Sequence, residues 1–146
     1  FFYNLDWDFN MLKFSEIPET TEYLYKHLDT ERLMFRLVPF AETANKDIYC
    51  FAYDGDNEPF IVCIDTDNAE DAEFSAEDFG NLVFQRLALA ITDLVTDEED
   101  IAKIKAHIKF LPEEYQQMFI EQDIDRIEDA FSEYDVLRII DIYKNK

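Results

Sequence analysis

Aromatic and β-branched residues follow one another in short runs in the first half of the chain. The clearest runs are Leu33–Val38, Ile48–Tyr53 and Phe60–Asp65, and we expect each of them to form a β-strand. The stretch Asn4–Phe14 alternates less regularly and is a further candidate strand. This part of the chain therefore predicts a sheet.

Residues Pro18–Leu28 have the pattern of a short helix between these runs. Pro18 suits the first turn of a helix, where no amide donor is needed. Tyr23, Leu24 and His27 are spaced so that they share one face of this helix.

The second half of the chain shows helical spacing. Ser75 is a suitable N-cap, and Glu77 and Asp78 follow it at the positive end of the predicted helix dipole. The apolar stripe of this helix consists of Phe79, Leu82, Val83, Leu87, Ala90, Ile91 and Leu94. It is the strongest helix signal in the sequence.

Further helices are expected toward the C-terminus. Thr96-x-x-Glu99 is a capping box, and Pro112 marks another helix start. After Pro112, apolar residues recur at helical spacing: Ile120, Ile124, Ile127 and Phe131. Residues 136–143 fit a helix or a strand, and we favour a helix.

Strand-like runs followed by helical segments indicate an α+β fold. We expect a mixed, mostly antiparallel sheet flanked by helices, with an all-helical C-terminal region. The predicted organisation is a single domain over residues 1–146. Its sheet-rich part and covering helix occupy residues 1–95, and a helical extension occupies residues 96–146.

The turn residues between the second and third runs predict a hairpin register. If Asp54 faces Pro59, then Tyr53 opposes Phe60, and the remaining pairs are Phe51–Val62, Tyr49–Ile64, Ala52–Ile61 and Cys50–Cys63. A register centred on Asp54-Gly55 would place Pro59 inside a paired strand, where it removes a ladder donor. Both faces of the hairpin are largely apolar, so we expect a sheet that is covered on both sides.

The expected register makes Cys50 and Cys63 cross-strand neighbours. We favour two small buried thiols in the core, and a disulfide is the alternative. Two cysteines are too few for a secreted disulfide scaffold, and the apolar runs are too short for a membrane helix. The chain begins at Phe1 without an initiator Met. We expect a reducing, cytoplasmic location.

The net charge of the chain excludes several classes of binding partner. The 146 residues carry 13 Lys and Arg against 34 Asp and Glu, so the net charge is 13 − 34 = −21. This balance argues against binding to nucleic acid or to an anionic membrane, since both need cations on the protein. Because 48% of the residues are hydrophobic and 16% aromatic, the chain has enough apolar surface to fold around a core.

The sequence contains no recognisable catalytic or cofactor motif. Its two glycines, Gly55 and Gly80, are far apart, so no phosphate-binding loop or dinucleotide fingerprint is present. The possible zinc ligands Cys50, Cys63, His27 and His107 lack the usual spacing. We therefore expect no enzyme activity, no metal and no cofactor.

The acidic loops that begin at Asp54 and Asp65 resemble calcium loops but fail the pattern. Pro59 and Glu70 occupy the sixth positions, where glycine is needed. An irregular calcium site or a hydrolase with paired carboxylates is a minor alternative. Most of the acidic residues fit the solvated faces of helices and loops.

We instead expect the acidic turns to contact a basic protein partner, because opposite charges steer fast association. Turn residues are accessible to a partner. The candidate partner-binding residues are Asp54, Asp56, Glu58, Asp65, Asp67, Glu70 and Asp71.

The order of segments resembles the SUKH superfamily. Leu37-Val38-Pro39-Phe40-Ala41 is similar to its "PFA" strand, and Asp47-Ile48-Tyr49-Cys50-Phe51 is similar to its "D-x-Y-C-F" strand. Pro59–Asp67 fits "P-V-x-x-x-D-x-D", and Ser75 to Leu82 fits the "S-F-x-x-F-L" helix. The resemblance covers roughly residues 33–92, with a looser match at Leu12–Ile17. The family's N-terminal helix is absent before Phe14, and Lys46 stands where the family often has glycine.

The resemblance implies a non-enzymatic binding domain with a mixed sheet flanked by helices. Many bacterial members of this family are immunity proteins that neutralise polymorphic toxins, often nucleases, and fungal relatives are regulators. A toxin domain is thus the partner that the resemblance implies. A regulatory or scaffold module of the same fold is the alternative, and the oligomeric state stays open.

Overall fold

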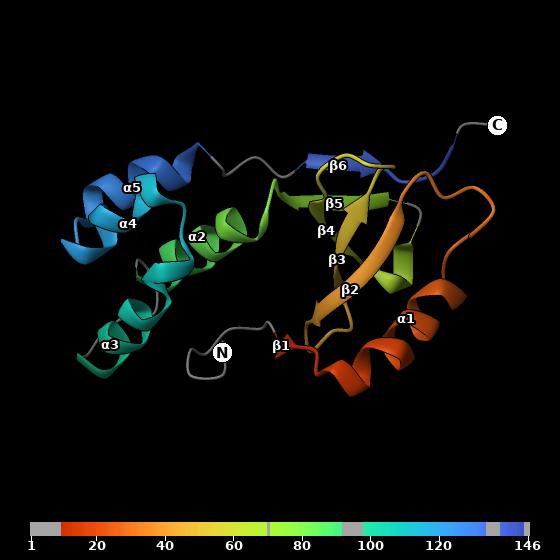
Figure 1. Ribbon diagram of the computed structural model, residues 1–146, viewed down its shortest axis with the longest axis horizontal. Coiled ribbons are helices and arrows are strands. Elements are labelled where there is room, and N and C mark those ends of the chain that lie inside the picture. The colour runs from red at the N-terminus through yellow and green to blue at the C-terminus, as the bar shows by residue number, and fades with distance from the viewer. Residues whose placement is uncertain (1–9, 70, 92–97, 134–137, 145–146) are drawn as a thin grey trace. The chain divides into compact units, whose positions relative to one another are not determined.

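The computed structural model describes residues 10–69, 71–91, 98–133 and 138–144, which form two compact units. The first unit holds the sheet and helix α1, and the second holds helices α2 to α5 (Figure 1). The α+β class expected from the sequence is confirmed. The boundary expected at residues 95 and 96 lies outside the described residues, and the units separate after Glu77.

The first unit is built on a six-stranded sheet with the order β1-β2-β3-β4-β5-β6. Each strand therefore lies beside the strands that precede and follow it along the chain. Every described pairing is antiparallel. The strands are β1 Asn10–Met11, β2 Arg36–Glu42, β3 Ile48–Tyr53, β4 Phe60–Ile64, β5 Asp71–Ala76 and β6 Arg138–Asp141.

The three strands expected from aromatic and β-branched runs are present. β3 has the predicted bounds, and β4 ends one residue early. β2 starts three residues later than expected and continues to Glu42, with a bulge between Pro39 and Ala41. Of the candidate strand at residues 4–14, only Asn10–Met11 is a strand, and residues 1–9 lie outside the described part.

The predicted hairpin register is wrong by one residue. Cys50 pairs with Val62 and Phe51 with Ile61, rather than Cys50 with Cys63. The turn explains the shift, because Asp54 belongs to it and is not paired with Pro59: the Asn57 amide donates to the Asp54 carbonyl at 3.1 Å, so the turn is one residue longer than predicted. Gly55 stands in this turn with φ +58°, a left-handed conformation that glycine adopts without strain.

The corrected register places the two cysteines on opposite faces of the sheet, because directly opposed residues share a face and their neighbours do not. Neither cysteine forms a disulfide. Cys50 is fully buried, and Cys63 is half-buried. Burial, and to a smaller extent the nearby Cys63, raises the pKa of the Cys50 thiol well above its ordinary value.

Helix α1 (Ile17–Lys26) covers one face of the sheet (Figure 1). It buries Leu24 completely and is followed by the buried Leu28, in one cluster with residues of β2, β3, β4 and β5. The expected face of Tyr23, Leu24 and His27 is wrong in part. Tyr23 and His27 are exposed, with ring centroids 4.6 Å apart, because the buried stripe runs through Leu24 and Leu28.

The opposite face of the sheet is also apolar. Phe40 stacks on Phe51 with ring centroids 4.5 Å apart, and Ile61 and Tyr49 are buried. Both faces therefore carry core residues, as the sequence of the hairpin predicts.

Two tyrosine hydroxyls tie distant parts of the first unit together. The Tyr25 hydroxyl and the Leu37 backbone are 3.1 Å apart, which joins α1 to β2. The Tyr143 hydroxyl donates to the Ala69 carbonyl and accepts from the Asp29 amide, both at 3.1 Å. These bonds satisfy buried polar groups that would otherwise cost stability.

The C-terminal segment is a strand, so the helix favoured for residues 136–143 is wrong within the described part. Ile140 pairs with Ala72, and Ile142 is fully buried, whereas Ile139 is 62% exposed. This alternation of buried and exposed residues has the period of a strand, and it is what places Arg138–Asp141 beside β5. The predicted all-helical C-terminal region is therefore corrected.

Ser75 is not the N-cap of the next helix, because it lies inside β5. The N-cap is Asp78, whose carboxylate accepts from the Asn81 amide at 2.8 Å. The helix it starts is α2 (Phe79–Leu89), which belongs to the second unit and contacts α3 and α5 there. Leu94 of the expected stripe lies outside the described residues.

The second unit consists of α2, α3 (Glu98–His107), α4 (Glu113–Ile120) and α5 (Ile124–Ser132). Its core is centred on Phe84, which stacks on Tyr115 at 4.1 Å and meets Phe119 edge-on at 6.0 Å. Pro112 precedes α4 as predicted. A Cβ on Gly80 would lie 3.2 Å from the Pro112 ring, so this close approach favours glycine.

The isoleucine pattern from 120 to 131 spans two helices rather than one. Gln122 takes φ 54° and ends α4, and Asp123 caps α5 by accepting from the Arg126 amide at 3.2 Å. The predicted start of α3 at Thr96 lies outside the described residues, whereas Glu99 is within the helix.

Replacing Leu24 with Ala should destabilise the first unit by about 2–5 kcal/mol, because it removes a fully buried side chain from the α1–sheet cluster. Hydrogen exchange of the β3 and β4 amides measures the free energy of unfolding of the first unit alone. The control is Lys26→Ala on the same helix, where the side chain is 71% exposed and the change should stay within about 0.5 kcal/mol. Equal effects of the two changes would contradict the packing of α1.

The two thiols should differ in reactivity toward a disulfide reagent at pH 8. Cys63 is expected to react in the native protein, whereas Cys50 should react only after denaturation, because burial keeps its thiol protonated. The amount of thiolate that the reagent releases from the Cys50→Ser and Cys63→Ser variants, in native and in denatured protein, shows which cysteine reacts in each state. Rapid labelling of native Cys63→Ser protein would show that Cys50 is accessible.

Candidate functional site

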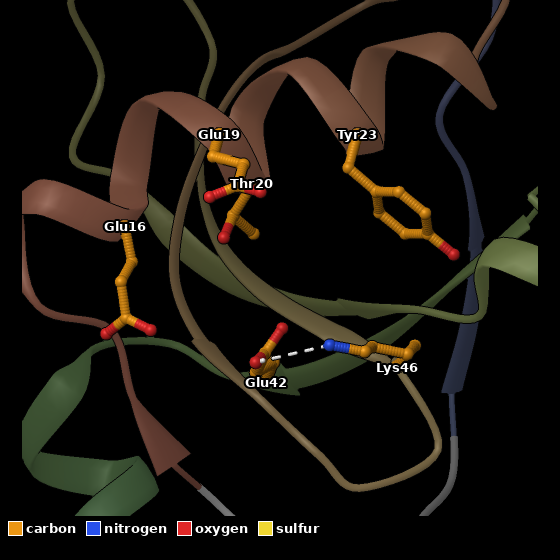
Figure 2. A pocket seen from close by; sticks show the side chains of 6 residues that line it. All are labelled: Glu16, Glu19, Thr20, Tyr23, Glu42 and Lys46. Carbon is orange, nitrogen blue, oxygen red and sulfur yellow. Dashed lines mark ion pairs between the residues drawn. The ribbon is translucent and has the colours of Figure 1, made fainter.

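A cavity of about 210 Å³ lies between α1 and the end of β2 in the first unit. We call it the acidic pocket, and its lining residues are Glu16, Glu19, Thr20, Tyr23, Glu42 and Lys46. Figure 2 shows the four residues of the helical wall directed toward Glu42 and Lys46 on the other wall.

The helical wall follows from residue spacing. The 3-10 helix η1 (Phe14–Glu16) leads directly into α1. Glu16, Glu19, Thr20 and Tyr23 are separated by three, four and seven positions, which places them on one stripe of a helix. This stripe lies beside the buried one that contains Leu24, so burial of Leu24 aims the polar stripe at the pocket.

Local chemistry also favours carboxylates at this helix start. The Glu16 carboxylate accepts from the Lys13 amide at 2.8 Å, as in a capping box. Glu19 lies in the first turn of α1, where the positive end of the helix dipole stabilises a negative charge.

The other wall is made by the tight turn that links β2 to β3. The Thr43 amide donates to the Asp47 carbonyl at 2.9 Å, and the Lys46 amide donates to the Thr43 carbonyl at 3.1 Å. Lys46 has φ 68°, a left-handed conformation that L side chains rarely adopt. The turn thus holds Lys46 beside Glu42 at the mouth of the pocket.

Lys46 and Glu42 form an ion pair, with the Lys46 Nζ 3.6 Å from the Glu42 Oε1 (Figure 2). The Glu42 side chain is 25% exposed, whereas that of Lys46 is 62% exposed. An exposed lysine holds such a pair weakly, typically by less than about 1 kcal/mol. The Glu42 carboxylate is therefore the more buried charge, and its counterion is the more mobile partner.

The pocket is chemically suited to bind a cation-bearing side chain. Three carboxylates face one ammonium group, which gives −3 + 1 = −2 among the lining residues. Glu19, Thr20 and Tyr23 make no side-chain hydrogen bond or ion pair within the described part of the chain. Their oxygens remain able to accept hydrogen bonds from a ligand.

The lining residues do not form a metal centre, since no group of three or more His, Cys, Asp or Glu among the described residues is arranged to hold a metal ion. The cavity is also smaller than the roughly 300–1,000 Å³ of typical small-molecule pockets. Its volume suits a single side chain.

The structure divides the acidic residues expected from the sequence between opposite ends of β4. Asp54, Asp56 and Glu58 lie in the turn before it, and Asp65 and Asp67 follow it. The five-residue strand separates the groups by about 17 Å at about 3.3 Å per residue. They therefore do not form one contiguous patch.

Asp65 and Asp67 lie at the pocket end of the sheet. They flank the start of the 3-10 helix η2 (Thr66–Asn68), and the Thr66 hydroxyl donates to the Lys46 carbonyl at 3.4 Å. Asp65 also accepts from the Asp67 amide at 2.9 Å. Glu70 lies outside the described residues, and the Asp71 backbone begins β5 opposite Asp141.

Sequence reasoning missed the residues of the pocket. The spacing of Glu16 and Glu19 around Pro18 could have indicated an acidic first turn. No signal in the sequence joins this turn to Glu42 and Lys46, because the strand order of the fold brings them together.

Comparisons with known proteins identify no relative. No family model matches the chain, and no curated protein or solved structure matches it. Among the helices that the structure describes, none is long and apolar enough to cross a membrane.

The left-handed backbone at Lys46 can be tested with two substitutions that both remove the ion pair. Lys46→Gly should be more stable than Lys46→Ala by about 1 kcal/mol, because only glycine takes φ 68° without strain. Chemical denaturation measures the difference. The same pair at Lys13, where φ is −72°, is the control, and glycine should bring no gain there. If the glycine variant were more stable than the alanine variant at Lys13 but not at Lys46, the described turn would be contradicted.

Proposed function

We propose that this chain is a non-enzymatic protein-binding domain that recognises a basic partner protein. The observation that carries the proposal is the convergence of acidic side chains at the pocket end of the sheet. There, η1, α1 and the end of β2 place three carboxylates around a cavity that one side chain can fill, and the loop after β4 is bonded through Thr66 to the backbone of Lys46 beside it.

The local charge supports this interpretation. Three glutamates line the pocket with a single cation, Lys46, and Asp65 and Asp67 flank Thr66 in the adjacent loop, so these six charged residues sum to −5 + 1 = −4. The opposite end of β4 has a positive residue close by, because Arg36 lies over the Tyr53 ring at 4.4 Å. A surface of one sign raises the association rate of a partner of the opposite sign.

For the class of partner we propose a toxin domain, and for the chain a role as a bacterial immunity-type protein in the cytoplasm. The SUKH-like order of segments is the motivation, and Lys46 adds support because it adopts the glycine-like backbone at the position where that family often has glycine. A nuclease toxin has a basic active site because it binds phosphates, and an acidic domain can cover it.

The experiment compares capture of a partner by three forms of the chain. Wild type is set beside a pocket variant, E16Q/E19Q/E42Q, and a charge-matched control, D54N/D56N/E58Q. Both variants change the net charge from −21 to −18. Glutamine can replace Glu16 in the capping box, so α1 should form in the pocket variant.

Wild type and control should capture the same basic protein from a lysate of the source organism, identified by mass spectrometry, and the pocket variant should lose it. With the purified partner, the association rate should fall as salt rises. Loss of binding in the control variant instead would place the interface at the hairpin turn. Failure of wild type to bind any basic protein would contradict the proposed function.

A further inference from the structure

We infer that the partner docks by inserting an arginine side chain into the acidic pocket while an adjacent apolar side chain packs on Phe14. This inference rests on the proposed function and specifies how the surface recognises its partner. It depends on two separate features of the first unit, an exposed aromatic ring and a cavity with mixed polar and aromatic walls.

Phe14 is the first feature. Its side chain is 93% exposed, the highest value among the large hydrophobic residues that the structure describes. Covering such a side chain removes apolar surface from water, so a partner that covers it gains affinity. Phe14 lies in η1 two residues before Glu16 in the sequence, so an apolar side chain next to the entering arginine can reach it.

The walls of the pocket favour arginine over other cations. Carboxylates approach from α1 on one side and from Glu42 on the other, and a guanidinium group can donate hydrogen bonds in several directions at once. Tyr23 supplies an aromatic wall, on which a guanidinium plane can stack. Thr20 adds a hydroxyl acceptor. Lysine offers a compact charge with no plane to stack.

Lys46 explains how the pocket is kept stable without a partner. Its ammonium group compensates the charge of Glu42, which would otherwise lie half-buried and unpaired. Since Lys46 is mostly exposed and the pair is long at 3.6 Å, it can be displaced at little cost. An arginine that enters would take over Glu42 and release Lys46 to solvent.

The test uses synthetic peptides and the full chain. Acetyl-Gly-Arg-Leu-Gly-amide is titrated into labelled protein and followed by amide chemical shifts, beside peptides in which citrulline or lysine replaces arginine, or serine replaces leucine. Citrulline retains the shape of arginine without its charge. We expect the arginine peptide to bind about tenfold more tightly than the citrulline peptide, with smaller losses for lysine and serine.

The shifts should map to residues 14–23 and 42–46. In the Phe14→Ala protein, the leucine peptide should bind no more tightly than the serine peptide. In the Glu42→Gln protein, the arginine peptide should bind no more tightly than the citrulline peptide. The control Asp56→Asn has the same charge change as Glu42→Gln and should have no effect. Because Phe14 is so exposed, its replacement should leave the fold intact.

Equal binding of the arginine and citrulline peptides, or shifts centred on Asp54–Glu58, would overturn the inference. So would equal binding of the lysine peptide, which would assign the pocket to an ammonium group. The proposed function fails separately, when wild type captures no basic protein. If Phe14→Ala and Glu42→Gln both retain full affinity for a captured partner, only the docking mode is wrong.

Discussion

The packing of α1 on the sheet is the constraint on which the candidate site depends. Leu24 can be buried against the sheet in only one rotation of the helix about its axis. That rotation turns the neighbouring stripe of Glu16, Glu19, Thr20 and Tyr23 toward the turn after β2. The hydrophobic contact thus determines where the charges lie, although the charges themselves contribute little to the stability of the fold.

The turn between β2 and β3 completes the site from the other side. It is short and internally bonded, and it holds Lys46 in a left-handed conformation that costs free energy. The ion pair with Glu42 and the hydrogen bond from Thr66 to the Lys46 carbonyl both depend on this turn. A single turn thereby connects the pocket to the acidic loop after β4.

The sequence predicts the strands β2, β3 and β4, whereas β5, β6 and the register of the hairpin are not predictable from it. The runs at β3 and β4 are rich in β-branched and aromatic residues, and their bounds were obtained to within one residue. The predicted register is wrong because it depends on whether Asp54 is paired or belongs to the turn, which is decided by the hydrogen bond between the Asn57 amide and the Asp54 carbonyl.

A helix is favoured for residues 136–143 because the apolar residues of this short segment fit either period, whereas residues 138–141 form a strand. Only pairing with β5, distant in sequence, selects the strand. The residues of the pocket are not predictable from the sequence for a similar reason. Asp54 and Asp65 both lie in evident turns, but β4 holds those turns apart, and the residues that do converge come from segments without a shared motif.

The large negative charge says more about function once the carboxylates that stabilise the fold are set aside. Several carboxylates accept backbone amides and serve the fold: Glu16, Asp65, Asp78, Asp123 and Asp141. Such caps explain why acidic residues are tolerated at element ends.

Glu19 and Glu42 differ from these caps, because neither accepts a backbone amide within the described residues. The Glu42 side chain is 25% exposed, and its ion-pair partner among the described residues is a largely exposed lysine. The function that we propose accounts for both carboxylates, because a cation from a partner would bind them, and this role separates them from the carboxylates that the fold itself requires.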